Sequence, residues 1–196
     1  NEGDLVLFCA DNKKVVYGVL IILETLSFLQ KKEIENIKIA KFEFFNPIYV
    51  GDTAEVNIYR QKDLRIIIKV KNIICSQITL SLKKVPLKYL YNNIYYGNNL
   101  KLKKNIIIKI KNLKKNLYKY SKIDKGIIND LFIISYFVGG VFPGHGSIIS
   151  SIEFYKVKNY EKSKKKENFD FYLKYKNKNF NFYIINFIGE NFYKIL

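Results

Sequence analysis

The sequence predicts an α+β fold in which a buried helix is wrapped by a curved antiparallel sheet, built twice in tandem. Two observations predict it. An almost uniformly apolar helical segment is followed by segments in which apolar and polar residues alternate. The same succession recurs after roughly 100 residues, which indicates an internal repeat. We therefore expect a first repeat over 1–85, a linker over 86–103 and a second repeat over 104–196.

The first repeat opens with a helix over 15–30. This segment is apolar on nearly every face, which predicts a buried helix rather than an amphipathic surface helix. The polar residues 31–35 are expected to end it. Residues 37–45 then alternate with a period of two, which predicts a strand. Further strands are expected over 54–60, 64–71 and 76–83, joined by turns at 61–63 and 71–72.

The second repeat follows a segment of different composition. Residues 84–103 carry Pro86, Gly97 and four tyrosines, which is typical of a linker or a long crossover. A second mostly apolar helix is predicted over 126–138. The Lys-rich run 162–166 is expected to be a solvated hairpin tip. The expected strands of this half are 106–110, 147–155, 169–176, 180–188 and 192–196.

The large positive net charge is only weak evidence for a nucleic-acid partner. The 196 residues carry a net charge of +17, from 34 Lys and Arg against 17 Asp and Glu. Only Arg60 and Arg65 are arginines, whereas base readout and bidentate phosphate contacts favour arginine. The excess of Lys, Asn and Ile indicates AT-rich codon usage instead. Nucleic-acid binding through the lysines is therefore expected to be weak and abolished by moderate salt.

Two cysteines, Cys9 and Cys75, form neither a disulfide framework nor a CxxC metal-ligand pair. A reducing, cytoplasmic location is expected, and no metal site is predicted. The longest apolar run, 15–23, is too short to span a bilayer. No charged and apolar segment typical of a signal peptide is visible in the first residues of the given sequence, so none is expected there. Because it begins at Asn1 rather than at Met, we expect further residues upstream.

Three motifs stand in a suggestive order. Phe44 to Asp52 has the form F-x-x-P-φ-x-x-G-D, and Pro143 to Ser147 reads P-G-x-G-S after an apolar helix. Asn1 is followed by Ala10 and then by the helix start V-Y-G-V-L at 16–20. Together they resemble the MaoC-like, (R)-specific enoyl-CoA hydratase family, which has the hot-dog fold. The first repeat keeps the helix start and the G-D turn, and the second keeps P-G-x-G-S. This division resembles a tandem double hot dog.

The resemblance implies an acyl-thioester hydratase or dehydratase. Such an enzyme needs a positioned acid/base pair and a donor that polarises the thioester carbonyl, which a backbone N–H at a helix start supplies. Asp4 stands where the family has His, and the family's Asp would lie upstream of Asn1. Tyr17 replaces another family His. The implied proton-transfer groups are Asp4 and His145, and the implied substrate-binding residues are Asn1, Tyr17, Gly18, Gly144, Gly146 and Ser147.

Plain structural roles stand beside these assignments. Asp4 fits an ordinary loop or cap aspartate, and His145 a solvent-facing loop histidine. Gly18 and Gly144 both fit positions where the backbone needs a missing Cβ. Asp52 fits a turn aspartate.

Other functions stay open at this point. A hot-dog thioesterase needs only one carboxylate to activate water, which Asp4 or Asp11 would supply. A non-catalytic protein that binds an acyl chain or a partner subunit is the third alternative. The expected partner is acyl-CoA or acyl carrier protein, whose phosphates the lysines would attract. No cofactor is expected beyond the CoA or phosphopantetheine carrier. The expected assembly is a homodimer or a monomeric double hot dog.

Overall fold

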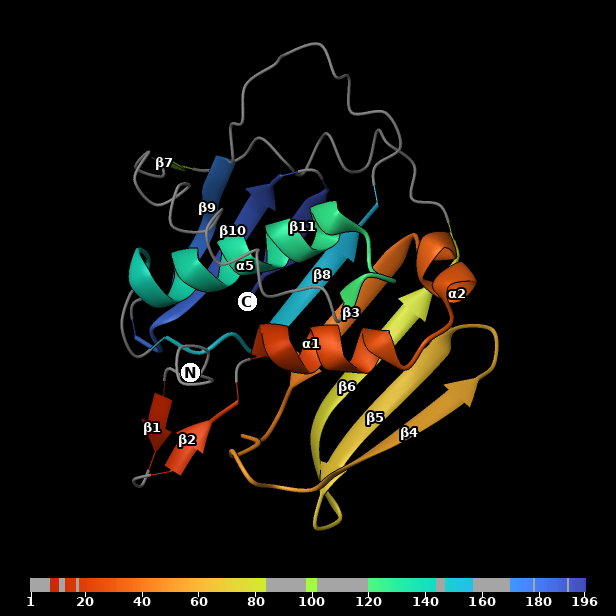
Figure 1. Cartoon of the computed structure of the whole chain (residues 1–196). Helices are drawn as coiled ribbons and strands as arrows, with labels where there is room; N and C mark the ends of the chain where they lie inside the picture. The colour runs from red at the N-terminus through yellow and green to blue at the C-terminus, as the bar shows by residue number, and fades with distance from the viewer. Residues whose placement is uncertain are drawn as a thin grey trace.

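The computed structural model describes residues 8–10, 13–16, 18–83, 98–101, 120–143, 147–156, 170–177, 179–189 and 191–196. They form three helices and eleven strands (Figure 1). The helices are α1 (Gly18–Ser27), α2 (Lys31–Asn36) and α5 (Lys125–Gly140). The first strands are β1 (Phe8–Ala10), β2 (Lys13–Val15), β3 (Ile39–Phe44), β4 (Ala54–Arg60), β5 (Leu64–Val70) and β6 (Ile73–Ser81). The others are β7 (Asn98–Lys101), β8 (Ser151–Tyr155), β9 (Asp170–Asn177), β10 (Phe182–Ile188) and β11 (Phe192–Ile195).

One nine-stranded sheet organises the molecule. Its strand order is β4-β5-β6-β3-β8-β11-β10-β9-β7, and every neighbouring pair is antiparallel. Strands from the two ends of the chain meet at β3 and β8, where Phe42 lies opposite Ile152 and Lys41 opposite Glu153. The short strands β1 and β2 form a separate antiparallel pair before α1.

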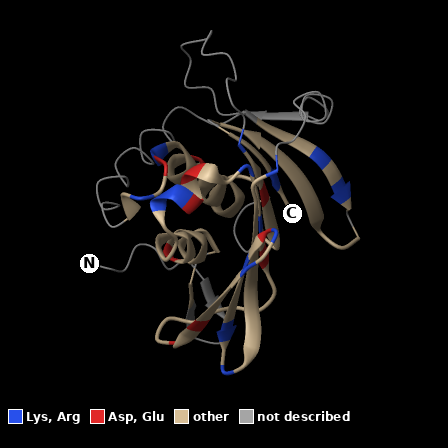
Figure 2. Cartoon of the chain, turned by 90° about the vertical axis from the view of Figure 1, so that its right-hand side faces the viewer, with Lys and Arg blue, Asp and Glu red and all other residues tan. Residues whose placement is uncertain are grey.

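Both long helices pack on the same face of the sheet. Figures 1 and 2 show α1 and α5 side by side against it, with the sheet curving behind them. Their apolar faces and the facing strand residues form one core. Within it, the ring of Phe137 on α5 stacks on Phe171 of β9 with centroids 3.6 Å apart, and Phe171 lies 4.5 Å from Phe187. The predicted α+β arrangement, a buried helix against an antiparallel sheet, is confirmed.

The helix-free face of the central strands is polar. Lys41 and Glu43 of β3 form an ion pair there, and the Lys194 Nζ lies 3.5 Å from the Glu153 Oε1. Outward strand positions thus carry charge without disturbing the core, as expected of lysines introduced by codon bias. Figure 2 shows the described lysines and arginines spread over helices, strand ends and turns.

The period-two pattern located most strands well. β4 has the predicted bounds, and the predicted turn at Lys71 and Asn72 is a two-residue hairpin in which both residues have positive φ, 48° and 66°. The second apolar helix is α5, and it ends at Gly140. Residues 106–110 and 162–166 lie outside the described residues.

Other boundaries are corrected by the structure. The helix predicted over 15–30 is shorter, because Lys13–Val15 pairs with β1 instead. The polar run after it forms α2, where the Glu33 side chain accepts from the Gln30 N–H as part of a capping box. β6 begins at Ile73, and β8 begins only at Ser151. β7 lies inside the expected linker 86–103 and pairs with β9.

In the part of the chain that the structure describes, no helix has both the length and the apolar character that crossing a bilayer requires.

The stacked Phe137 provides a test of this core. Phe137→Ala should lower the free energy of unfolding by about 3–5 kcal/mol, because it removes a fully buried ring and leaves a cavity. Phe28→Ala is the control, since Phe28 is 62% exposed and its removal should change stability by less than about 0.5 kcal/mol. Urea titration of both variants measures the difference. Equal losses in the two variants would contradict the packing described here.

Candidate functional site

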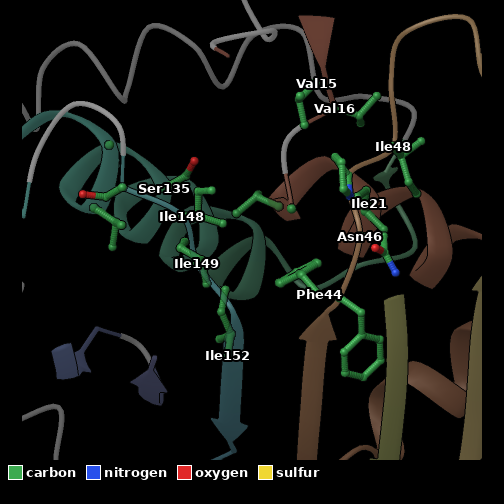
Figure 3. Close-up of a pocket in the computed structure, with 17 residues that line it drawn as sticks. Val15, Val16, Ile21, Phe44, Asn46, Ile48, Ser135, Ile148, Ile149 and Ile152 are labelled. Atoms are coloured by element: carbon green, nitrogen blue, oxygen red, sulfur yellow. The ribbon is translucent and has the colours of Figure 1, made fainter. Parts of the chain in front are cut away.

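A pocket of about 310 Å³ lies between the start of α1 and the end of α5. Its wall takes Gly18, Val19 and Ile21 from α1 and Ser135, Val138 and Gly139 from α5. Val15 and Val16 before α1, the turn 44–48, and Ser147, Ile148, Ile149 and Ile152 complete the described lining. In Figure 3, Ser135 lies on the opposite side of the pocket from Ile21 and Ile48. The pocket therefore joins elements from both halves of the chain.

Backbone hydrogen bonds hold these segments together. The Phe44 N–H, at the end of β3, donates to the Ser150 carbonyl just before β8, at 2.9 Å. The Val16 N–H donates to the Ile48 carbonyl at 2.7 Å, which ties the approach to α1 to the turn after β3. The Ser150 N–H in turn donates to the Leu196 carbonyl at 2.8 Å, which ties the segment before β8 to the residue after β11. Main-chain hydrogen bonds thus hold the approach to α1, the turn after β3 and the segment before β8 in place.

The G-D turn has a structural role. The Asp52 carboxylate accepts from the Tyr49 N–H at 2.8 Å, and the Asp52 N–H donates to the Tyr49 carbonyl at 3.0 Å. Gly51 has φ of +95°, a conformation that favours glycine. The expectation that Asp52 is a turn aspartate is confirmed.

The ring of Phe44 leaves little room for a side chain at position 18. A Cβ on Gly18 would lie 3.0–3.3 Å from three ring carbons of Phe44, tighter than ordinary van der Waals contact. The ring of Phe44 therefore packs directly on the first residue of α1. The missing Cβ lets the sheet approach the helix start, so Gly18 has a packing role in addition to the substrate contact implied by the resemblance.

The lining is mostly apolar. The polar side chains of its described part are Asn46, Ser135 and Ser147, and none of them titrates near neutral pH. The Asn46 Nδ2 donates to the Ile74 carbonyl at 2.8 Å, which fixes this side chain at the rim. The helix start contributes backbone N–H groups, since the first turn of a helix has no intrahelical acceptors. Among the described residues, no cluster of His, Cys, Asp and Glu suits a metal ion.

Cys75 lies beneath the turn that lines the pocket but is no nucleophile. It is buried in a small cluster with Ile48, and its Sγ lies 3.9 Å from the Pro47 carbonyl. Burial raises the pKa of the Cys75 thiol, and the charge of Asp52 raises it further. A buried thiol with a raised pKa has less thiolate and is a poorer nucleophile than an exposed one.

The structure brings together two of the predicted site residues. Gly18, at the start of α1, and Ser147, from the P-G-x-G-S motif, line the same pocket. Pro143 of that motif follows a cis peptide bond with Phe142. The remaining predicted residues, Asn1, Asp4, Tyr17, Gly144, His145 and Gly146, lie outside the described residues, as does Asp11.

The structure contains a buried carboxylate, Asp130, that the sequence analysis did not predict. Asp130 on α5 is fully buried and accepts from the Asn191 N–H at 3.0 Å and from the Asn191 Nδ2 at 3.4 Å. A Cβ on Gly189 would collide with it. Burial, and after it the charge of Asp130, holds the pKa of Tyr193 well above its ordinary value. Asp130 is absent from the pocket lining and fastens the turn between β10 and β11. The sequence pattern that could have indicated this buried carboxylate is the polar pair Asn129 and Asp130 inside an otherwise apolar helix.

The two long helices differ at their starts. The Asp124 carboxylate caps α5 by accepting from the Gly126 N–H at 2.8 Å and the Ile127 N–H at 3.3 Å. Asp124 is therefore the N-cap of α5. The start of α1, in contrast, lies at the pocket wall.

Comparison with known proteins gives structural likenesses. No protein-family model matches the sequence, and no curated protein matches it. Solved structures that the chain resembles include HtdX from Mycobacterium tuberculosis, at 10% identity and a TM-score of 0.48, over 92% of this chain and 87% of that one. The tesB protein of Mycobacterium avium subsp. paratuberculosis is 8% identical, with a TM-score of 0.49 over 97% and 88%. A trans-AT PKS dehydratase domain from Brevibacillus brevis is 11% identical, with a TM-score of 0.34 over 82% and 76%.

The contact between Gly18 and Phe44 provides a test by double substitution. Gly18→Ala alone should destabilise the protein by about 1–2 kcal/mol, because the new methyl group displaces the ring. In a Phe44→Leu background the same change should be neutral or stabilising, since alanine favours the helix. Unfolding in urea measures the coupling energy. Equal effects of Gly18→Ala in both backgrounds would contradict this packing role.

Proposed function

We propose that this protein binds acyl thioesters in the pocket between α1 and α5 and is a MaoC-like hydratase or dehydratase. One observation carries the proposal. Gly18 and Ser147 come from two motifs far apart in the sequence, and they line one apolar pocket. A pocket with apolar walls and a few polar groups is the usual form of a small-molecule site.

The proposal includes two tandem hot-dog repeats, which the strand order supports. After α1, the strands of the first half lie in the order β4-β5-β6-β3. After α5, those of the second half lie in the corresponding order β9-β10-β11-β8. The first strand after each helix lies at the junction, and these two strands pair antiparallel, as a two-fold relation between the halves requires.

The chemistry follows from the pocket. The acyl chain would lie against the apolar wall of the pocket. The thioester carbonyl would accept a hydrogen bond from a backbone N–H in the first turn of α1, and we propose the Gly18 N–H as this donor. This donor stabilises the enolate charge that develops during hydration. Water adds as hydroxyl at the β-carbon and as a proton at the α-carbon, and the reverse step eliminates it. Asp4 and His145 are the proposed proton-transfer groups, and His145 stands two residues before Ser147.

A second candidate is binding without turnover. It is favoured because the described lining holds no carboxylate and no imidazole. Under this alternative the protein would hold an acyl chain or support a partner subunit. A thioesterase, with Asp4 or Asp11 activating water, differs from the hydratase in its product. In every case the proposed ligand is acyl-CoA or acyl carrier protein, and the surface lysines would attract the carrier's phosphates.

Two readouts on one substrate test the proposal. Crotonyl-CoA is incubated with the protein while 3-hydroxybutyryl-CoA and free thiol are measured separately. Hydration should appear without thiol release, and it should fall by about 10²-fold or more in Asp4→Ala and in His145→Ala, because each removes a proton-transfer group. Glu55→Ala is the control, since this exposed carboxylate lies on the edge strand β4 and outside the described pocket lining.

The outcomes separate the alternatives. Thiol release would replace the hydratase by the thioesterase. Tight binding of crotonyl-CoA with neither product would support the non-catalytic protein. Unchanged hydration in Asp4→Ala and His145→Ala, with all variants folded, would remove these residues from the site. Absence of both binding and turnover would overturn the proposal.

A further inference from the structure

We propose that the end of the β9–β10 hairpin docks this protein on an anionic lipid surface. Five exposed side chains carry the proposal. Three are aromatic, Tyr175, Phe180 and Phe182, and two are basic, Lys174 and Lys176. None of the five belongs to the described lining of the pocket. The inference therefore goes beyond the proposed function and does not depend on it.

The hairpin end extends past its neighbouring strands. β7 pairs with β9 only as far as Leu173, and β11 pairs with β10 only from Ile185 onward. Beyond these limits, residues 175–177 of β9 and 182–184 of β10 pair only with each other among the described residues. In Figure 2 the hairpin projects at the right of the molecule, with basic residues in blue near its end. It is a two-stranded ribbon with no described strand on either side.

The turn of the hairpin is ordered and presents an aromatic ring to solvent. The Asn177 Oδ1 accepts from the Asn179 N–H at 3.0 Å and from the Phe180 N–H at 3.3 Å. Phe180 is 82% exposed. Tyr175 and Phe182, at the adjoining strand ends, are 48% and 37% exposed, and their ring centroids lie 6.5 Å apart. Exposed apolar side chains gathered at one place are typical of an interaction surface.

The charge beside these rings is positive. Lys174 and Lys176 are exposed, and the sequence from 171 to 189 contains no Asp or Glu. The Lys176 Nζ lies 5.4 Å from the centroid of the Tyr183 ring, which meets the ring of Phe142 edge-on at 5.2 Å. These contacts hold one cation close to the aromatic tip. A complementary partner is therefore both anionic and able to accept apolar rings.

An anionic bilayer meets both requirements. Aromatic side chains concentrate at the level of the lipid headgroups, and lysines near the surface are attracted by anionic lipids. Fluid headgroups close around a narrow tip, whereas a specific protein interface needs about 800 Å² on each partner, more than the end of two strands offers. Single-stranded nucleic acid stacks on aromatic platforms, but the rings of Tyr175 and Phe182 meet at 62°.

The first test measures co-sedimentation of the protein with phosphatidylcholine vesicles that contain or lack phosphatidylserine. Binding should require phosphatidylserine and weaken as the salt concentration rises. Phe180→Ala should weaken it about tenfold or more, because the ring no longer enters the headgroups. Lys174→Ala and Lys176→Ala should each weaken it about fivefold. Phe28→Ala and Lys62→Ala, which remove an exposed ring and an exposed lysine elsewhere, are the controls and should leave binding nearly unchanged.

The second test locates the tip directly. The sequence contains no tryptophan, so a single introduced tryptophan reports its own surroundings. Phe180→Trp should retain binding, and its fluorescence should shift to shorter wavelength on addition of anionic vesicles, because the indole moves from water to the headgroups. Phe28→Trp should show no shift. Both substitutions replace exposed rings, so neither is expected to disturb the core.

Several results would overturn the proposal. Equal losses of binding in Phe180→Ala and Phe28→Ala, or in Lys174→Ala and Lys62→Ala, would indicate adsorption through the net charge alone. Vesicle binding without a fluorescence shift in Phe180→Trp, or no binding to anionic vesicles, would also overturn it. Binding to oligo(dT) that is lost in Phe180→Ala, with no vesicle binding, would replace the lipid by single-stranded nucleic acid. Turnover of crotonyl-CoA is measured separately, so the failure of either proposal is distinguishable from that of the other.

Discussion

The antiparallel pairing of β3 with β8 is the contact on which the rest of the structure depends. It joins a four-stranded group and a five-stranded group into one sheet and thereby gives α1 and α5 a shared surface to cover. It also creates the pocket. Because the strands run in opposite directions, the end of β3 lies beside the beginning of β8, and the Phe44 N–H reaches the Ser150 carbonyl. The turn that follows β3 and the loop that precedes β8 therefore meet at the same end of the two central strands.

At this end of the central strands, α1 contributes its start and α5 contributes its end. Unpaired N–H groups at a helix start attract negative charge and carbonyl oxygens. In α5 this capacity is used internally, because Asp124 accepts from the first turn. The start of α1 instead borders a pocket whose described side chains are apolar or uncharged. Val16 and Ile48 are among the apolar residues that line this pocket.

Local sequence patterns predicted most helices, strands and turns. They did not predict the contacts that depend on residues far apart in the sequence. β4 and the turn at Lys71 and Asn72 follow from alternation and turn chemistry, which act over a few residues. The partners of Gly18 and Asp130 are Phe44 and Asn191, and neither partner is visible from sequence spacing. For Gly18, the sequence predicted a close approach by the thioester, whereas the neighbour that the structure shows is the ring of Phe44. Of the predicted site, Gly18 and Ser147 are placed together, and Asp4 and His145 stay predictions.

The position of β8 between β3 and β11 has a consequence for biosynthesis. The first half can form its own strands early, but the edge of β3 stays unpaired until residues 151–155 have left the ribosome. Its hydrogen-bonding groups are then a template for pairing with another nascent chain. The segment 147–152 gains its second support later still, when the Leu196 carbonyl accepts from Ser150 and Ser151. The pocket wall thus depends on contacts between residues far apart in the sequence, and such contacts are the slow ones to form in folding.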